Sequence, residues 1–144
     1  MDSEFKPVAN KILSSGVVPV RYALGDWRLL ILRHGQRWDF PAGVINIHED
    51  AQAAAQRETL AATGISDLEF VFGEDYKETT PYAGNQVSRY YVAETRVETI
   101  TPPAPCRPGK PAADEWRWVT CEEAEDSLPP RLAHVLAWVQ DRIN

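Results

Sequence analysis

The chain contains little cysteine, with two among its 144 residues. Cys106 and Cys121 lack the spacing of metal ligands and need not pair, so we expect reduced thiols, as in a cytoplasmic protein. No hydrophobic run approaches the length of a membrane span, and no charged-then-apolar leader marks the chain for secretion. Lys and Arg number 15 against 21 Asp and Glu. The resulting net charge of -6 excludes a general attraction to nucleic acid.

The rest of the composition is that of an ordinary globular protein. Hydrophobic residues make up 44% of the chain and charged residues 25%, as is typical of a soluble domain. The length is sufficient for one core and no internal repeat divides it, so we expect a single domain over residues 1–144. Prolines cluster in residues 101–111, which we expect to form an extended surface loop.

Apolar patterning predicts the secondary structure. β-Branched and apolar residues favour strands over residues 17–24, 27–33, 68–79, 86–95 and 115–119. Residues 50–63 are predicted to form a helix that ends at Gly64, where left-handed geometry costs glycine little. An amphipathic terminal helix is predicted from the helical spacing of Leu132, Val135, Leu136, Val139 and Ile143.

The most informative segment is GVINIHEDAQAAAQRETLAATGI, residues 43–65. Periodicity alone favours an ordinary amphipathic helix here, because alanine is the best helix former. Several residues at fixed spacing are, however, far more specific than a lone glycine motif. The fixed positions are Gly43, Glu49, Arg57, Glu58, Gly64 and Ile65.

This spacing resembles the signature of the Nudix (MutT-like) hydrolases, which carry paired glutamates where this chain has Ala61 and Ala62. The resemblance covers nearly the whole chain and implies a Nudix α/β/α sandwich with a mixed β-sheet. It also implies hydrolysis of a nucleoside diphosphate linked to another moiety, by metal-dependent attack of water on a phosphate. The implied cofactor is Mg2+ or Mn2+. A single remaining helix carboxylate predicts that this ion is weakly bound.

The resemblance assigns roles to particular acids and to one arginine. The candidate catalytic residues are Glu58, Arg57 and Glu49. Glu58 would be the surviving metal ligand, and Arg57 would pair with Glu49 to hold the helix against its loop. Glu115 is a second candidate metal ligand, and Glu74 is a further acid outside the motif.

The segment that leads into the motif carries a narrower resemblance. Residues 38–41, Trp-Asp-Phe-Pro, resemble the same entry in the asymmetrical dinucleoside tetraphosphate (Ap4A) hydrolases, a branch of the family. That branch carries Lys, His and Gly where this chain has Ala42, Val44 and His48. These losses fall on positions that the resemblance assigns to substrate and metal handling.

An acidic protein that binds a polyphosphate must concentrate positive charge locally. The candidate substrate-binding residues are Arg33, Arg37, Lys77 and Tyr82. The two arginines precede the motif, and Tyr82 lies in a loop that resembles the branch's substrate loop, where an aromatic face suits stacking on a base. The competing interpretation is a solvated surface charge for each cation and core packing for the tyrosine.

Three hypotheses about function follow. In the first, the chain is a working hydrolase of a dinucleoside polyphosphate-like substrate, in which Glu49 and an acid outside the motif assist Glu58. In the second, a catalytically impaired Nudix fold acts as a nucleotide-binding module. In the third, an active enzyme has had its glutamate pair replaced, by nature or by design. The expected partner is a nucleotide small molecule, with no nucleic-acid polymer and no membrane.

Overall fold

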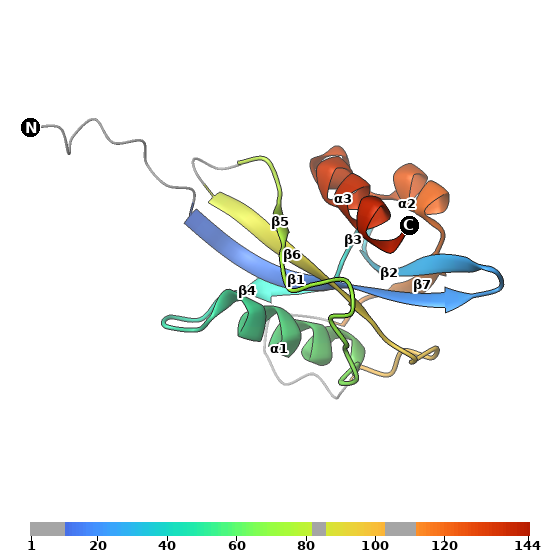
Figure 1. The fold of residues 1–144 in the computed structure, drawn as a ribbon. Coiled ribbons are helices and arrows are strands. Elements are labelled where there is room, and N and C mark those ends of the chain that lie inside the picture. Colours follow the sequence, from blue (N-terminus) through green and yellow to red (C-terminus); the bar gives the residue numbers. More distant parts are fainter. Residues whose placement is uncertain (1–10, 82–85, 103–111) are drawn as a thin grey trace, which may run out of the picture.

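The computed structural model describes residues 11–81, 86–102 and 112–144 (Figure 1). Its strands are β1 (Lys11–Ala23), β2 (Asp26–His34), β3 (Arg37–Asp39), β4 (Ala42–Val44), β5 (Lys77–Glu78), β6 (Gln86–Glu94) and β7 (Glu115–Val119). Its helices are α1 (Ala51–Thr63), α2 (Cys121–Ser127) and α3 (Ala133–Ile143), with the 3-10 turn η2 at Pro130–Leu132. Within the described ranges, no helix is long and apolar enough to cross a membrane.

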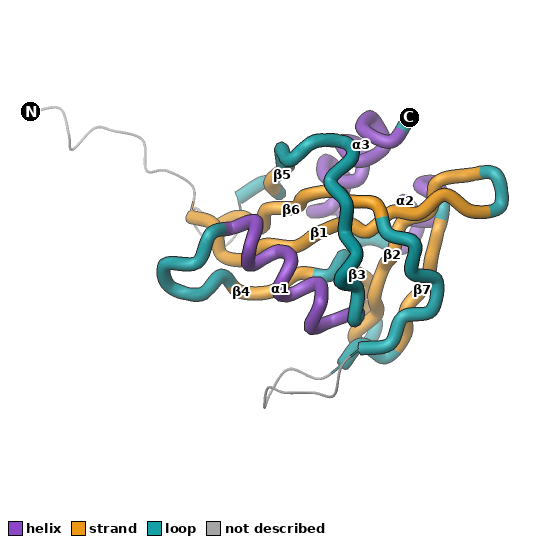
Figure 2. Tube along the Cα trace, turned by 60° about the horizontal axis from the view of Figure 1, so that its bottom comes forward, coloured by secondary structure: helices purple, strands orange, loops and turns teal. Residues whose placement is uncertain are grey.

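One mixed sheet runs through the centre of the fold. Its strands are hydrogen-bonded in the order β3-β2-β1-β6-β5, while β4 pairs with β1 and β7 pairs with β2. β1 and β6 run parallel, and the remaining pairs are antiparallel. Figures 1 and 2 show α1 on one face of this sheet and α2 with α3 on the other. The expected α/β/α sandwich is therefore confirmed.

The sheet is buried on both faces, and β2 shows why. Side chains alternate along a strand, and here both sets are apolar. Leu29 and Ile31 belong to the cluster under α2 and α3, whereas Leu30 and Leu32 belong to a second cluster with Ile65, just beyond α1. On the first side, α3 contributes the side chains that the spacing predicted, namely Val135, Leu136, Val139 and Ile143.

Most predicted elements are present, but the strand expected over residues 68–79 is wrong. In that range the structure has the isolated bridge Glu69 to Glu94 and the two-residue strand β5. Between them the chain turns, with the Gly73 N–H donating to the carbonyl of Phe70 at 3.1 Å and with φ of 108° at Gly73. This left-handed conformation interrupts an extended strand and suits glycine. Residues 103–111 of the expected proline-rich loop lie outside the described residues.

β1 fixes the position of α1 and of the segment that precedes it. The Ser15 hydroxyl donates to the carbonyl of Ala51 at 2.8 Å, and the backbone N–H of Val17 donates to the Thr59 hydroxyl at 3.3 Å. Between these two contacts, Gly16 pairs with Ala42, and a Cβ on Gly16 would collide with the carbonyl oxygen of Pro41. β4 and α1 are thereby both fastened to one strand.

Candidate active site

Helix α1 begins and ends as the sequence predicted. The Asp50 carboxylate caps its start by accepting hydrogen bonds from the N–H groups of Gln52 and Ala53, each at 3.1 Å. Its end is capped by Gly64, which has φ of 77° and whose N–H donates to the carbonyl of Leu60 at 2.8 Å. Each cap satisfies backbone groups that the helix leaves unpaired, and such an N-cap contributes about 1 kcal/mol.

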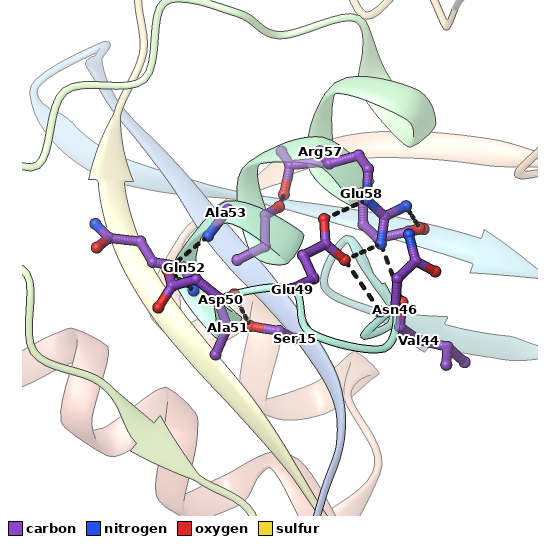
Figure 3. A network of polar contacts seen from close by, with 12 residues as sticks. Ser15, Val44, Asn46, Glu49, Asp50, Ala51, Gln52, Ala53, Arg57 and Glu58 are labelled. Carbon is purple, nitrogen blue, oxygen red and sulfur yellow. Dashed lines mark hydrogen bonds and ion pairs between the residues drawn. The ribbon is translucent and has the colours of Figure 1, made fainter.

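Arg57 joins the helix to the loop before it (Figure 3). Its Nε and Nη2 donate to the two carboxylate oxygens of Glu49 at 2.7 and 2.8 Å, so the pairing expected from the sequence is present and bidentate. Nη2 also donates to the carbonyl of Val44 at 3.1 Å, and Nη1 donates to Glu58. The hydrogen bond that Arg57 donates to Glu49 is the largest influence on the arginine and raises its pKa above the ordinary value. One guanidinium therefore holds two carboxylates and a loop carbonyl.

Glu58 is almost entirely buried, with 1% of its surface exposed. Its side chain lies directly over Gly43 of β4, where an added Cβ would collide with the Glu58 carboxylate. The motif glycine is thus required for space. A buried carboxylate is stable only when it is paired and hydrogen-bonded, and Arg57 supplies that pairing.

The two alanines that replace the glutamate pair occupy different environments. Ala61 is exposed. Ala62, one turn after Glu58, is half-buried and packs against the cluster that contains Leu30, Leu32, Ile65 and Ile100. The last turn of α1 therefore presents a methyl group to solvent at one position and a methyl group to the core at the other.

The segment from the end of β4 to α1 exposes apolar side chains and has a strained backbone at one residue. Val44 and Ile47 are 57% and 87% exposed. His48, at the position where the resembling branch has glycine, has φ of 65°. This is the left-handed conformation that favours glycine, and here a histidine adopts it.

Glu115, the second candidate metal ligand, lies away from the motif. It accepts a hydrogen bond from Arg33 Nε at 3.1 Å and pairs with Arg117 at 2.7 Å. The hydrogen bonds from Arg117 and then Arg33 lower the pKa of Glu115. These residues belong to the β2–β7 pair, whereas α1 packs against β1, β4 and β6. Glu74 approaches α1 more closely and accepts a hydrogen bond from Gln52 at 3.2 Å.

Of the candidate substrate-binding residues that the structure describes, the two arginines lie on one hairpin and the lysine lies far from them in the strand order. Arg33 and Arg37 lie on the β2–β3 hairpin, at one end of the strand order. Lys77 is exposed on β5, at the opposite end. Tyr82 lies outside the described residues.

A cavity of about 710 Å³ opens at the β2–β3 turn, next to the end of α2. Its walls are formed by His34, Gln36, Arg37, Trp38, Asp39, Ser127 and Pro129. The guanidinium groups of Arg117 and Arg33 lie 5.0 and 6.0 Å from the centre of the Trp38 ring. The cavity thus combines an aromatic ring with nearby positive charge.

Asp39 connects this cavity to the core, and sequence reasoning gave it no role. Its carboxylate accepts hydrogen bonds from Arg131 and, at 3.2 Å, from the Tyr90 hydroxyl. Burial is the main cause of the raised pKa of Tyr90. Burial alone would lower the pKa of Arg131, but the adjacent Asp39 outweighs it and that pKa is raised. The available signal was the basic Arg131 at the start of an otherwise apolar helical repeat.

The residues present do not fit the expected divalent metal. Mg2+ takes several oxygen ligands in near-octahedral geometry. Within the described ranges, no group of three or more His, Cys, Asp or Glu side chains is arranged to hold a metal ion. Glu58 is held by Arg57, and the positions one turn later carry methyl groups.

The capped helix α1 with Arg57 and Glu58, the close contact at Gly43 and the mixed sheet agree with the fold that the motif implied. A family model for the NUDIX domain matches residues 14–139, and the chain therefore belongs to the NUDIX domain family. By family resemblance it is a hydrolase, in a family that acts on derivatives of nucleoside diphosphates. None of the curated proteins compared with the chain matches it.

Solved structures agree with this fold. The chain is similar to the C. elegans Ap4A hydrolase in a binary complex, with a TM-score of 0.75 and 19% identity, over 90% of this chain and 97% of that chain. It is similar to RenU, a Nudix hydrolase from M. smegmatis (TM-score 0.68, 19% identity, 89% and 83% covered). It is also similar to the NUDIX domain of Shewanella oneidensis NrtR complexed with ADP ribose (TM-score 0.69, 12% identity, 100% and 94% covered).

Proposed function

We propose that this chain binds a nucleoside diphosphate derivative of the dinucleoside polyphosphate type and hydrolyses it at a strongly reduced rate. The observation that carries the proposal is the contrast within one motif. The Glu49–Arg57–Glu58 network is assembled, but the two positions that would complete a carboxylate cluster are Ala61 and Ala62. The fold is retained without the ligands that metal-assisted displacement of a phosphate requires.

The cavity beside Trp38 is the proposed place for one nucleoside of the ligand. An aromatic ring offers a face for a base, and Asp39 offers a carboxylate that can accept hydrogen bonds from exocyclic amines. Arg37 lines the same cavity and supplies positive charge for a phosphate. The volume, about 710 Å³, lies within the range of small-molecule sites.

The names of two similar structures support this class of compound. One is an Ap4A hydrolase in a binary complex, and the other is a NUDIX domain complexed with ADP ribose. Both names describe adenine nucleotides with linked phosphates. We extend this chemistry to the present chain because the Nudix fold is shared, and because the Trp38 cavity combines a ring with cationic and anionic groups.

A working hydrolase is the second candidate function. It is favoured by the Glu49–Arg57–Glu58 network, whose geometry is complete. In that case an acid outside the motif, such as Glu74 near the start of α1, would assist.

Calorimetry with a dinucleoside tetraphosphate, ADP ribose, ADP and inorganic phosphate, each with and without Mg2+, tests the proposal, together with turnover of the same compounds. We expect binding of the nucleotides and turnover far below the ordinary range of about 1–1,000 per second. Arg37→Gln should weaken binding about tenfold, equivalent to about 1.4 kcal/mol, whereas Lys77→Gln at the opposite sheet edge should leave it unchanged.

Two outcomes would overturn the proposal in different ways. Failure of every nucleotide to bind at millimolar concentration would remove the binding function. Ordinary turnover with Mg2+ would instead establish the working hydrolase.

A further inference from the structure

Arg57 binds two carboxylates, and the second of them, Glu58, has a role apart from metal chemistry. We propose that Glu58 is a structural residue in this chain, and that it fastens β4 and the loop after it to α1 without a metal ion. The inference deepens the proposed function, and it rests on that function only in taking the carboxylate cluster as lost.

The position of the Glu58 side chain is the first support. Only 2% of the side chain is exposed, compared with 17% for Glu49 and 28% for Arg57. The carboxylate fills the space above Gly43, where any larger residue would collide with it. A group enclosed in this way would have to leave its position to take its place among several ligands of a hydrated cation.

Charge compensation is the second support. Arg57 Nη1 donates to Glu58 while Nε and Nη2 hold Glu49, so the guanidinium bridges the two acids. Among the described residues, no buried side-chain nitrogen or oxygen lacks a hydrogen-bond partner. The buried acid is therefore satisfied by the protein itself and requires no ion to remain ionised.

The Glu49–Arg57–Glu58 network connects three elements of the fold. Arg57 also donates to the carbonyl of Val44, and the Asn46 N–H donates to Glu49 at 3.0 Å. Figure 3 shows these contacts running from the loop to the helix. Beneath them, Glu58 contacts Gly43 of β4. Helix, loop and strand are connected through two adjacent residues of α1.

The two roles of Glu58 predict different changes in stability when its charge is removed. If Glu58 served mainly as a metal ligand, Mg2+ would stabilise the unchanged chain, and removing the carboxylate would abolish that stabilisation while costing little in EDTA. If it is a structural ion pair, removing its charge leaves Arg57 partly unpaired and lowers stability whether or not metal is present.

The experiment is thermal unfolding of the whole, ligand-free chain in EDTA and in millimolar Mg2+. We expect Glu58→Gln to lower Tm by roughly 10 °C in both buffers, as for a broken buried pair in a domain of this size. Mg2+ should move the Tm of the unchanged chain by less than about 1 °C. Glu78→Gln, which disturbs the half-buried pair with Arg89 on β5 and β6, is the matched control and should cause a much smaller fall.

If Glu58→Gln does not fold, Arg57→Lys provides the same test, because it keeps the charge and loses the planar fork. Its Tm should fall in EDTA and should not recover in Mg2+. A Tm of Glu58→Gln equal to or above that of the unchanged chain in EDTA would overturn the inference, and so would a large Mg2+ stabilisation that Glu58→Gln abolishes. Nucleotide calorimetry on the unchanged chain decides the proposed function separately, so the two failures are distinguishable.

Discussion

The beginning and the end of the Nudix motif differ in how they are built. From Gly43 to Glu58 the motif residues are connected by ion pairs, hydrogen bonds and close packing. From Leu60 to Gly64 the helix carries alanines, one exposed and one packed on the core, and then ends at its glycine cap. The first part contains the ion pairs that shape the loop, whereas the second carries no charged side chain and contributes core packing and the helix cap.

The shape of the motif therefore does not depend on carboxylates at positions 61 and 62. Alanine is at least as good a helix former as glutamate, so the loss of the glutamate pair costs the helix nothing. It also removes the repulsion between acids that a metal must offset. Replacement of Arg57 or Gly43, in contrast, would disturb a buried charge or a close contact. The fold therefore forms with alanine at both of these positions.

Placing carboxylates at positions 61 and 62 should have the largest effect, and that effect should be on turnover. The variant Ala61→Glu/Ala62→Glu adds two carboxylates, three and four positions after Glu58 on α1. We expect turnover of a dinucleoside tetraphosphate with Mg2+ to rise about a thousandfold, equivalent to about 4 kcal/mol of barrier, because the phosphates regain an electrostatic clamp. Steady-state kinetics on the two proteins measure the effect.

The matched control for this variant is Ala61→Gln/Ala62→Gln, which adds similar volume without charge and should leave turnover unchanged. A glutamate variant that folds and binds metal but stays inert would contradict the expectation. The losses at Ala42, Val44 and His48 would then limit catalysis, in agreement with a binding module.

Gly43→Ala tests the packed part of the motif. The new methyl group would meet the Glu58 carboxylate, so the acid must move away from Arg57. We expect the free energy of unfolding in urea to fall by about 3 kcal/mol, from overpacking and a disturbed buried pair.

A double-mutant cycle identifies the cause of that fall. Gly43→Ala should cost much less in a Glu58→Ala background, because the colliding group is gone. Gly16→Ala is the comparison, since its Cβ would meet the backbone carbonyl of Pro41, which no side-chain deletion can relieve. Equal costs for Gly43→Ala in both backgrounds would show that the contact with Glu58 is unimportant.

Much of the fold could be predicted because its elements have simple patterns. The strands β2, β6 and β7 and the helices α1 and α3 follow apolar runs, helical spacing and end caps. The segment over residues 68–79 could not be predicted in this way. Its apolar residues resemble a strand, but the turn at Gly73 depends on local backbone geometry.

The site was less predictable, since it depends on contacts between distant residues. The Arg57–Glu49 pair followed from the motif and is present. The position of Glu115, held by Arg33 and Arg117, depends on the register of β2 with β7. The Asp39–Arg131 pair joins residues that are 92 positions apart in the sequence, and no spacing rule connects them.

Single substitutions of Ala61 and Ala62 should change stability by different amounts, because the two positions have different environments. Ala62→Glu places a carboxylate against the cluster with Leu30 and Ile65 and should cost about 2 kcal/mol. Ala61→Glu, on an exposed helix position, should change stability by less than about 0.5 kcal/mol. Urea unfolding of both variants is the measurement, and equal costs would contradict the environments described for them.

His48→Gly is expected to have a small effect on stability, and it should stabilise the protein. The histidine has φ of 65°, a conformation that costs a non-glycine residue about 1 kcal/mol. Glycine removes this strain but loses more conformational freedom on folding, so the net gain should be about 0.5 kcal/mol. His48→Ala retains the strained backbone and should bring no gain. Leu24→Gly, at φ of 56° in the β1–β2 turn, is the control for the same effect away from the motif. Urea unfolding distinguishes the cases: if His48→Gly lowers stability while Leu24→Gly raises it, the imidazole stabilises the loop, and the ion-paired part of the motif extends to His48.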